Sequence, residues 1–314
     1  MLPGMKGKPR IAIVGAGNLG CALAVSLRKA GYTIEAVIAR SRGASLKKAQ
    51  RLAREIGARA FASRPTSVRA DLYWFCVPDS QIAPAARALA EQGEWKERIA
   101  LHSSGALTSD ELAALRGRGA AVASVHPLMT FVRGSRPPLA GVPFAIEGDA
   151  AAVRAARRIV SDVGGNMHSI RKEDKPAYHA WGTFASPLFT ALLATTEQVA
   201  GAAGVNRKAA RRRMMPILLQ TLANYAAFDA AGAFSGPIVR GDVDTVKRHL
   251  RVLRDVPAAR EVYAALARAA LLYLPVKKRT ELGNALRSAS DRKLVGPPPQ
   301  AVLDEGLMRA IPTL

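Results

Sequence analysis

A glycine motif between a strand and a helix constrains the fold of this chain more than any other feature. Residues 11–14 are four apolar residues in a row, which is typical of a buried parallel strand. Gly15, Gly17 and Gly20 then complete the pattern G-x-G-x-x-G, and apolar residues recur at helical spacing behind it until Gly31. This order predicts a βαβ unit whose glycine turn holds the pyrophosphate of a dinucleotide.

Each glycine has a separate mechanical role in that unit. Gly15 permits the tight turn, Gly17 lets the backbone approach the phosphates, and Gly20 lets the helix pack closely on the strand. The phosphates are expected at the positive N-terminal end of the helix. The cofactor-binding residues predicted from this loop are Gly15, Gly17, Asn18, Leu19 and Gly20.

The end of the second predicted strand indicates which dinucleotide binds. NAD sites usually carry Asp or Glu there, about 20 residues after the motif, to bind the ribose 2′-hydroxyl. Residues 34–39 are followed here by Arg40, Ser41 and Arg42, without a carboxylate. Guanidinium groups bind phosphate through paired, charge-assisted hydrogen bonds. The sequence therefore favours NADP over NAD; the alternative is that Arg40 and Arg42 are ordinary surface arginines.

Composition excludes several classes of protein. With 314 residues, 49% of them hydrophobic, the chain is long enough for two domains with cores of their own. No apolar stretch is long enough to span a bilayer and no secretory signal is present, so we expect a cytoplasmic protein with no membrane partner. Cys21 and Cys76 are too few for a disulfide framework or a metal site, and we expect no metal.

The formal net charge of +22 raises the question of nucleic-acid binding. Lys and Arg are spread along the chain, with one tight cluster at residues 211–213, and no aromatic residues alternate with them for base stacking. We therefore do not expect a nucleic-acid partner. A positive field suits an anionic cofactor or an acidic substrate.

Strand and helix signals alternate in the first half of the chain, and helical periodicity alone continues in the second. The predicted strands are residues 11–14, 34–39, 72–77, 98–101, 121–125 and 142–147. The predicted fold class is α/β, an N-terminal doubly wound (Rossmann) domain with an all-α C-terminal domain. The expected boundaries are residues 1–170 for the dinucleotide-binding domain, 171–290 for a helical substrate and dimerisation domain, and 291–314 for a proline-rich linker and short terminal helix.

Polar residues follow the predicted strands at their carboxyl ends, where ligands bind in open α/β sheets. Val77, Pro78 and Ser103 are expected beside the nicotinamide half of the cofactor. The residues expected beside the substrate are His102, Ser104 and His126, whose side chains can hydrogen-bond an acceptor atom. The alternative for either histidine is a structural hydrogen-bond donor.

The first helix of the second half begins with a lysine and carries a histidine one turn later. Lys175 lies near the helix N-terminus, with Pro176 in the first turn, and His179 follows four residues on. A neighbouring histidine and a positive helix end lower the proton affinity of a lysine, which suits a general acid. Lys175, His179 and His102 are the predicted catalytic residues. The alternative for the pair is a solvated lysine beside a half-buried histidine.

Two further positions in the second half have expected roles. Arg240, in a loop at residues 235–242, is predicted to bind a substrate carboxylate or a cofactor phosphate, and Asp242 to cap the next helix. Pro187, inside a helical stretch, removes one backbone hydrogen bond and predicts a kink.

Six segments, taken in order, resemble one family. They are IAIVGAGNLG, VPDSQIA, HSSGAL, SVHPLMTF, KPAYHAWGTFAS and GPIVRGDVDTVKRHL, and they span residues 10–275. The chain resembles Rossmann-like oxidoreductases with a helical C-terminal domain of unknown function, which are similar in plan to pyrroline-5-carboxylate reductase and, more distantly, to β-hydroxyacid dehydrogenases. The resemblance implies an NADP-linked fold and, by analogy, a homodimer formed through the helical domains. Lys175 and His179 occupy places similar to a lysine and an asparagine in β-hydroxyacid dehydrogenases.

Together, the motifs and the resemblance predict an NADPH-dependent reductase that transfers a hydride to a small compound with a C=O or C=N bond. His102, Lys175 or His179 would supply the proton or polarise the acceptor. The alternative is a non-catalytic NADP-binding protein that acts as a redox sensor or an interaction module, because a fold alone does not settle function.

Overall fold

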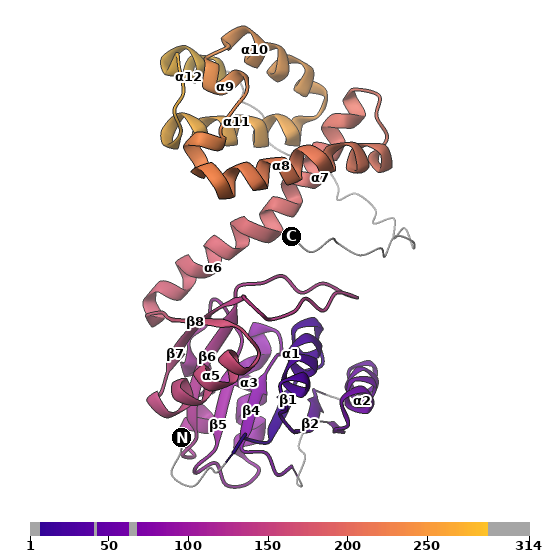
Figure 1. Ribbon diagram of the computed structural model, residues 1–314, viewed down its shortest axis with the longest axis vertical. Coiled ribbons are helices and arrows are strands. Elements are labelled where there is room, and N and C mark those ends of the chain that lie inside the picture. Colours follow the sequence, from indigo (N-terminus) through magenta and orange to yellow (C-terminus); the bar gives the residue numbers. More distant parts are fainter. Residues whose placement is uncertain (1–6, 41–42, 63–67, 288–314) are drawn as a thin grey trace. The chain divides into compact units, whose positions relative to one another are not determined.

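The computed structural model describes residues 7–40, 43–62 and 68–287. The chain divides into two compact units, Met1–Pro187 and Leu188–Leu314 (Figure 1). The expected terminal segment, residues 291–314, lies outside the described residues. Residues 171–187, which the sequence assigned to the helical domain, belong to the first unit, because their helix is hydrogen-bonded to the sheet.

The first unit is built on one eight-stranded sheet. Its strands are β1 (Ile11–Val14), β2 (Ile34–Ala39), β3 (Arg59–Ala62), β4 (Leu72–Phe75), β5 (Ile99–His102), β6 (Ala121–Pro127), β7 (Pro143–Gly148) and β8 (Asn166–Ser169). The order is β3-β2-β1-β4-β5-β6-β7-β8, and every neighbouring pair is parallel except β6 with β7. The strand order reverses between β1 and β4, and ligands bind at the carboxyl ends of strands at such a point.

Helices cover both faces of this sheet, and each face has its own buried cluster. The helices of the first unit are α1 (Asn18–Lys29), α2 (Ala44–Ile56), α3 (Ile82–Ala90), α4 (Ala113–Arg116), α5 (Ala150–Asp162) and α6 (Lys175–Thr183). Ile11 and Ile13 pack in one cluster with Leu27 of α1, whereas Ala12 packs in the other with Ile82 of α3. Because its strands are buried on both faces, the sheet is encoded by unbroken apolar runs.

The predicted fold class is confirmed, and every predicted strand forms with ends within two residues of those expected. Two edge elements were not predicted. β3 and β8 are four residues long, with the sequences RAFA and NMHS, and neither is fully buried. Short, partly exposed strands do not need the apolar run by which a central strand is recognised.

The described residues of the second unit form helices only. They are α7 (Phe189–Ala202), α8 (Arg207–Ala233), α9 (Pro237–Arg240), α10 (Val243–Val252), α11 (Pro257–Tyr273) and α12 (Arg279–Arg287), with a 3-10 turn after α10. A small buried cluster joins Val246 and Leu250 of α10 to Leu271 and Leu282. Asp242 caps α10 as predicted, since its Oδ1 accepts a hydrogen bond from the Thr245 N–H at 3.1 Å.

Pro187 lies in a π-helical turn, Phe184–Leu188, between α6 and α7. Proline has no N–H for the α-helical ladder, so it interrupts the regular hydrogen bonding at this point. The interruption expected at Pro187 is present as a π turn, whereas a kink there stays a prediction, and the first unit ends at the same proline.

Among the described residues, no single helix is long and apolar enough to cross a membrane. One bent pair, residues 172–202 with residues 207–240, reaches that length and composition only when its two helices are counted together.

Candidate functional site

The glycine loop between β1 and α1 requires glycine at two positions for steric reasons. Gly15 has a φ of +105°, and a Cβ there would lie 2.6 Å from the carbonyl oxygen of Cys76. A Cβ on Gly20 would collide with the carbonyl oxygen of Gly15. At Gly17, by contrast, a Cβ would make an ordinary 3.8 Å contact with Cys76. The protein alone therefore has room for a Cβ at Gly17, whereas a closely approaching phosphate would leave no room for it.

Helix α1 begins directly after this loop and presents an uncapped N-terminus. Within the part of the chain that the structure describes, no side chain accepts from its first N–H groups, and its first turn contains no acidic residue. Unpaired N–H groups and the helix dipole together favour an anion at this end. The Asn18 side chain donates to the carbonyl oxygen of Phe131 at 3.1 Å and so holds the start of α1 to the segment after β6.

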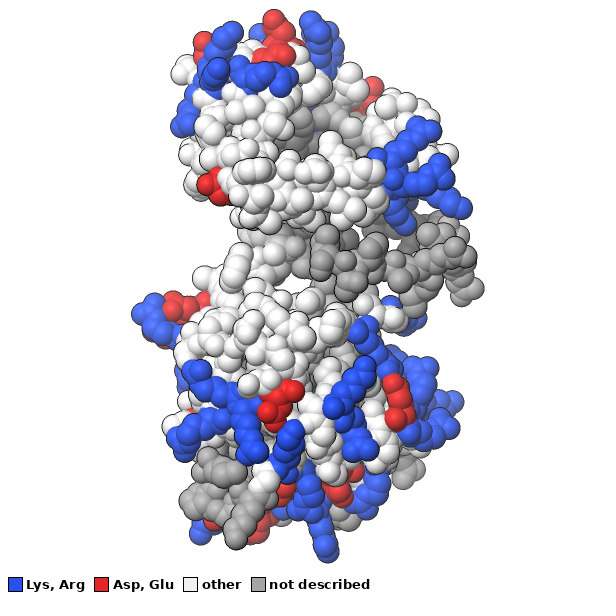
Figure 2. Space-filling model, viewed as in Figure 1, with Lys and Arg blue, Asp and Glu red and all other residues white. Residues whose placement is uncertain are grey.

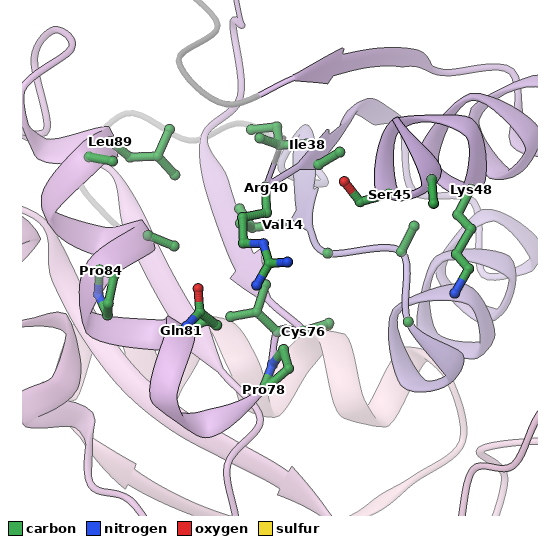
Figure 3. A pocket seen from close by; sticks show the side chains of 18 residues that line it. Val14, Ile38, Arg40, Ser45, Lys48, Cys76, Pro78, Gln81, Pro84 and Leu89 are labelled. Carbon is green, nitrogen blue, oxygen red and sulfur yellow. The ribbon is translucent and has the colours of Figure 1, made fainter. Parts of the chain in front are cut away.

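A pocket of about 560 Å³ lies beside the glycine loop (Figure 3). It is formed by the carboxyl ends of β1, β2 and β4 together with parts of α2 and α3. In Figure 3 the Arg40 side chain extends into the middle of the pocket, with Gln81 and Pro84 on one side and Ser45 and Lys48 on the other. The pocket therefore meets the loop at the point where the strand order reverses.

The charges that line this pocket are positive. Arg40 and Lys48 contribute two cations, Ser45 contributes a hydroxyl, and none of the lining residues that the structure describes is acidic. Arg40 lies where the sequence placed it, whereas Ser45 and Lys48 were not predicted. Their position in the sequence could have indicated this role, because both residues lie in the first turns of α2, the helix that follows Arg40. Ser41 and Arg42 lie outside the described residues.

The pocket brings together only part of the predicted cofactor set. Its lining includes Gly15, Gly17, Arg40, Val77 and Pro78. Ser103 is not among the lining residues; its Oγ accepts from the Trp74 indole at 2.8 Å and its N–H donates to the Phe75 carbonyl at 3.2 Å. Leu19 and Gly20 belong to α1, next to the loop.

A polar cluster lies at the carboxyl ends of β5 and β6, against helix α6. We call it the β6–α6 cluster; its members are Ser104, Gly105, Ser124, His126, Lys175, Tyr178 and His179. Lys175 is fully buried, and its Nζ donates to Ser124 Oγ at 2.8 Å and to the Ser104 carbonyl at 3.1 Å. Ser104 Oγ in turn donates to the Asp79 carboxylate at 2.9 Å. Since Asp79 follows the pocket residue Pro78, these bonds connect the pocket to the cluster.

Lys175 is an ionisable residue in a buried setting. Burial lowers the pKa of Lys175, and the carboxylates of Glu147 and Asp79 oppose that shift. Glu147 is itself held by Ser109, which donates its backbone N–H at 2.6 Å and its hydroxyl at 2.8 Å. In this geometry Lys175 ties the segment that follows β5 and the middle of β6 to α6. That it passes a proton to a substrate stays a prediction.

His102 has both ring nitrogens engaged within the protein. Its Nδ1 accepts from the Ser104 N–H at 3.1 Å, and its Nε2 lies 2.9 Å from the Thr108 carbonyl oxygen. A carbonyl only accepts, so the proton is on Nε2. Burial lowers the pKa of His102 to about 4, and Lys175 adds to the shift. The ring is therefore a neutral structural donor, which is the alternative that the sequence left open, and the geometry does not support His102 as the catalytic acid.

The neutral, buried His102 makes stability depend on pH in a defined window. The pKa of His102 is about 4 in the folded protein, and its ordinary value of 6.5 applies to the unfolded chain. Between these two pH values the unfolded chain therefore binds more protons than the folded protein. Stability should fall as pH drops from 6.5 to 4. We expect this fall to be smaller in His102→Gln by about 2–3 kcal/mol, measured by urea unfolding across the window. Equal falls in both proteins would contradict the assignment.

His126 and His179 approach each other at the surface of the β6–α6 cluster. Their ring centroids are 6.1 Å apart, and His126 Nδ1 lies 3.3 Å from the Tyr178 hydroxyl. Tyr178 was not predicted, although its spacing of three residues from Lys175 places both on one face of α6. Arg240 is exposed at the end of α9 in the second unit, and its role toward a substrate stays a prediction.

Two family models match the sequence. A Rossmann-like domain matches residues 5–127, and a domain of unknown function, DUF2520, matches residues 142–270. The chain therefore contains a match to a Rossmann-like domain followed by a match to a domain of unknown function. No functionally curated protein matches this sequence.

Solved structures share the fold over most of their length. A Bacteroides fragilis protein proposed to be an NADP oxidoreductase is 23% identical with a TM-score of 0.71, covering 83% of this chain and 97% of its own. An imine reductase from Pseudomonas is 21% identical with a TM-score of 0.60, covering 90% and 99%. A reductive aminase from Aspergillus terreus, in complex with NADPH, is 14% identical with a TM-score of 0.60, covering 88% and 99%. At these identities the likeness shows the fold.

Proposed function

We propose that this protein is an NADP-dependent reductase that acts in the cytoplasm and transfers a hydride to a small compound with a C=O or C=N bond. The observation that carries the proposal is the pocket beside the glycine loop, which the described residues Arg40, Ser45 and Lys48 line without any carboxylate among the described lining residues. A carboxylate there would serve a ribose 2′-hydroxyl, whereas cations suit a 2′-phosphate. The imine reductase and the NADPH-bound reductive aminase that share this fold support the reaction class.

The residues present fit an NADP molecule. The backbone at Gly17 and the uncapped start of α1 would hold the pyrophosphate. Arg40, Ser45 and Lys48 would hold the phosphate on the adenosine ribose. Bound NADPH supplies the hydride. The protein's own tasks are to orient the acceptor and to manage its charge and proton.

The β6–α6 cluster is the proposed place for the acceptor. It is linked to the pocket through the hydrogen bond between Asp79 and Ser104. Lys175 holds the segment that follows β5 and the middle of β6 from a buried position, whereas His126 and His179 retain exposure to solvent. Polar groups at strand ends next to a dinucleotide pocket are suitably placed to bind and polarise a small acceptor. Saturable NADPH binding without turnover of any carbonyl or imine compound would favour the non-catalytic alternative.

Reversing the charge at Arg40 tests the cofactor assignment. In Arg40→Asp, the ratio of NADPH to NADH affinity should fall at least tenfold, because a lost charge-assisted contact to phosphate costs about 1.5–3 kcal/mol. Calorimetric titration of both dinucleotides measures the ratio. The matched control is Arg51→Asp, the same charge change at an exposed position of α2 that does not line the pocket. The same fall in both variants would show a general effect of charge and contradict the assignment.

The helical unit carries an apolar surface that we propose is covered by the same surface of a second copy. Ile217, Tyr225, Phe228, Leu272 and Tyr273 are each more than 60% exposed. In Figure 2, Lys and Arg gather at the ends of this unit, and a broad uncharged surface lies between them where Figure 1 labels α8 and α11. Monomeric proteins rarely expose large apolar patches, and a two-fold contact would cover these side chains on both copies.

Sedimentation velocity tests the homodimer. We expect a dimer at about 10 μM, since apolar burial of this kind contributes roughly 25 cal/mol per Å². Introducing charge through Ile217→Glu with Phe228→Glu should shift the protein toward monomer. A wild-type monomer at that concentration would contradict the proposal.

A further inference from the structure

Strand β6 and helix α6 present matching faces to each other. Ser124 and His126 are two residues apart in β6 and so point to the same side of the sheet. Lys175 and Tyr178 are three residues apart on α6 and share a face of the helix. Each strand residue meets one helix residue, Ser124 with Lys175 at 2.8 Å and His126 with Tyr178 at 3.3 Å. His126 is therefore held from one side by a specific partner.

The imidazole of His126 is held in place by its neighbours. The ring of Tyr178 meets it edge-on, with centroids 5.6 Å apart and an interplanar angle of 89°. A Cβ on Gly105 would lie 2.9 Å from His126 Nε2 and 2.6 Å from His179 Cδ2, so Gly105 leaves the space that both rings occupy. The ring nevertheless stays partly exposed. It is a fixed group with one nitrogen not engaged by Tyr178.

The Tyr178 contact determines which nitrogen of His126 carries the proton. Tyr178 is only 8% exposed, and among the described residues His126 Nδ1 is the hydrogen-bond partner of its hydroxyl. Either group can donate across this 3.3 Å contact, and we take Tyr178 as the donor, because burial raises its pKa to about 12 and Nδ1 is the acceptor within its reach among the described residues. With Nδ1 accepting from Tyr178, the proton of a neutral His126 is on Nε2.

The groups around His126 keep its ring neutral. Burial lowers the pKa of His126 to about 4, and the nearby Lys175, His179 and His102 add to the shift. Tyr178, which contacts Nδ1, is uncharged, and His168 lies behind it, with its ring centroid 5.9 Å from that of Tyr178. No carboxylate contributes to the shift of His126 among the described residues. An N–H of this kind donates a hydrogen bond without giving up its proton.

We propose that His126, with its tautomer fixed by Tyr178, donates its Nε2–H to the acceptor atom of the substrate. The inference rests on the proposed reductase function and narrows its substrates to acceptors with a free lone pair, a carbonyl oxygen or an unprotonated imine nitrogen. When a hydride is transferred to the acceptor carbon, negative charge develops on the oxygen or nitrogen bonded to it. A preorganised N–H stabilises that charge. The acceptor atom then takes one proton from water, and His126 ends neutral, as it began. Tyr178 is a positioning residue in this scheme.

Nitrogen NMR tests the tautomer without any need for turnover. Long-range ¹H–¹⁵N spectra of the wild-type protein at neutral pH should show a His126 ring protonated at Nε2 and unprotonated at Nδ1, assigned by the signal lost in His126→Gln. In Tyr178→Phe the two tautomers should mix. An imidazolium, or a proton on Nδ1 in the wild-type protein, would overturn the proposal even if the protein is a reductase.

Two substitutions at His126 test the donor in catalysis. The amide nitrogen of glutamine reaches about as far as Nε2, whereas that of asparagine matches Nδ1. We expect kcat to fall about 100- to 1,000-fold in His126→Asn and less than tenfold in His126→Gln, with NADPH affinity unchanged in both. The loss of kcat in Tyr178→Phe should be intermediate between those of His126→Asn and His126→Gln. His168→Gln, which replaces an exposed histidine against the other side of Tyr178, should match the wild-type protein.

The outcomes separate this inference from the proposed function. Equal losses in His126→Asn and His126→Gln, or no loss in either, would overturn the donor role while leaving the reductase standing. Wild-type protein that binds NADPH but reduces no carbonyl or imine would overturn the proposed function, and the NMR result would still decide the tautomer. Melting curves of each variant show whether a loss of kcat comes from unfolding. If the His126 variants unfold, the kcat and the tautomer mixture of Tyr178→Phe decide whether His126 is the donor.

Discussion

Replacing Lys175 with methionine should slow turnover at least about a hundredfold while leaving NADPH affinity within a factor of two. The Nζ of Lys175 holds the Ser104 carbonyl and Ser124 Oγ, and with them the segment that follows β5 and the middle of β6. Methionine fills the same space without these bonds, and displacing groups beside a reacting centre by about 1 Å can reduce rates a hundredfold. The glycine loop and Arg40 lie in other elements, so we expect NADPH affinity to be retained. Steady-state kinetics and NADPH titration measure the two quantities.

Stability distinguishes this effect from unfolding. Keeping a buried ammonium charged is unfavourable, as the lowered pKa of Lys175 indicates, and Ser124 Oγ still donates to the Ser104 carbonyl at 3.2 Å without it. We therefore expect Lys175→Met to melt at or above the wild-type temperature. The matched control is Lys172→Met, which removes an exposed ion pair with Asp110 worth at most about 1 kcal/mol. Wild-type turnover in Lys175→Met, or equal losses in both variants, would contradict the role of Lys175.

Replacing Gly17 with valine should weaken NADPH binding at least a hundredfold in a protein that still folds. Gly17 has a φ of −76°, and among the described residues a Cβ there would meet nothing closer than 3.8 Å, so the loop accommodates a Cβ until a phosphate approaches. Gly20→Ala should behave differently, because its Cβ collides with the Gly15 carbonyl and overpacking costs about 1–3 kcal/mol. Calorimetry and thermal melts separate the two effects.

The control for both glycine variants is Gly201→Ala, since a Cβ there meets no atom within 4 Å. It should bind NADPH and melt like the wild-type protein. Wild-type NADPH affinity in Gly17→Val would show that the backbone at this position does not face a phosphate.

The elements that carry strong local signals could be predicted from the sequence. Burial on both faces requires the apolar runs of β1 and β4, and close backbone approach requires the glycines between β1 and α1. The local sequence pattern alone therefore reveals these elements. β3 escaped prediction because its four residues pair at an edge, where an arginine is tolerated. The position of Pro187 was readable, but not that its turn would be π-helical.

The candidate site was predicted only in part, because the sequence does not show which side chains find partners. Two strand-end histidines looked alike in sequence. The fold gives His102 a partner for each ring nitrogen and gives His126 only the Tyr178 hydroxyl among the described residues. Likewise Lys48 is one of many surface lysines until α2 packs beside the end of β2. Such pairings depend on how distant segments meet, which local patterns do not encode.

The most direct test of the account is a calorimetric titration of the unmodified protein with NADPH and, separately, with NADH. A pocket that holds a 2′-phosphate with Arg40 and Lys48 should bind NADPH at least tenfold more tightly, since each charge-assisted contact contributes about 1.5–3 kcal/mol. Equal affinities would contradict the assignment of NADP, and no binding of either dinucleotide would contradict the proposed function as a whole.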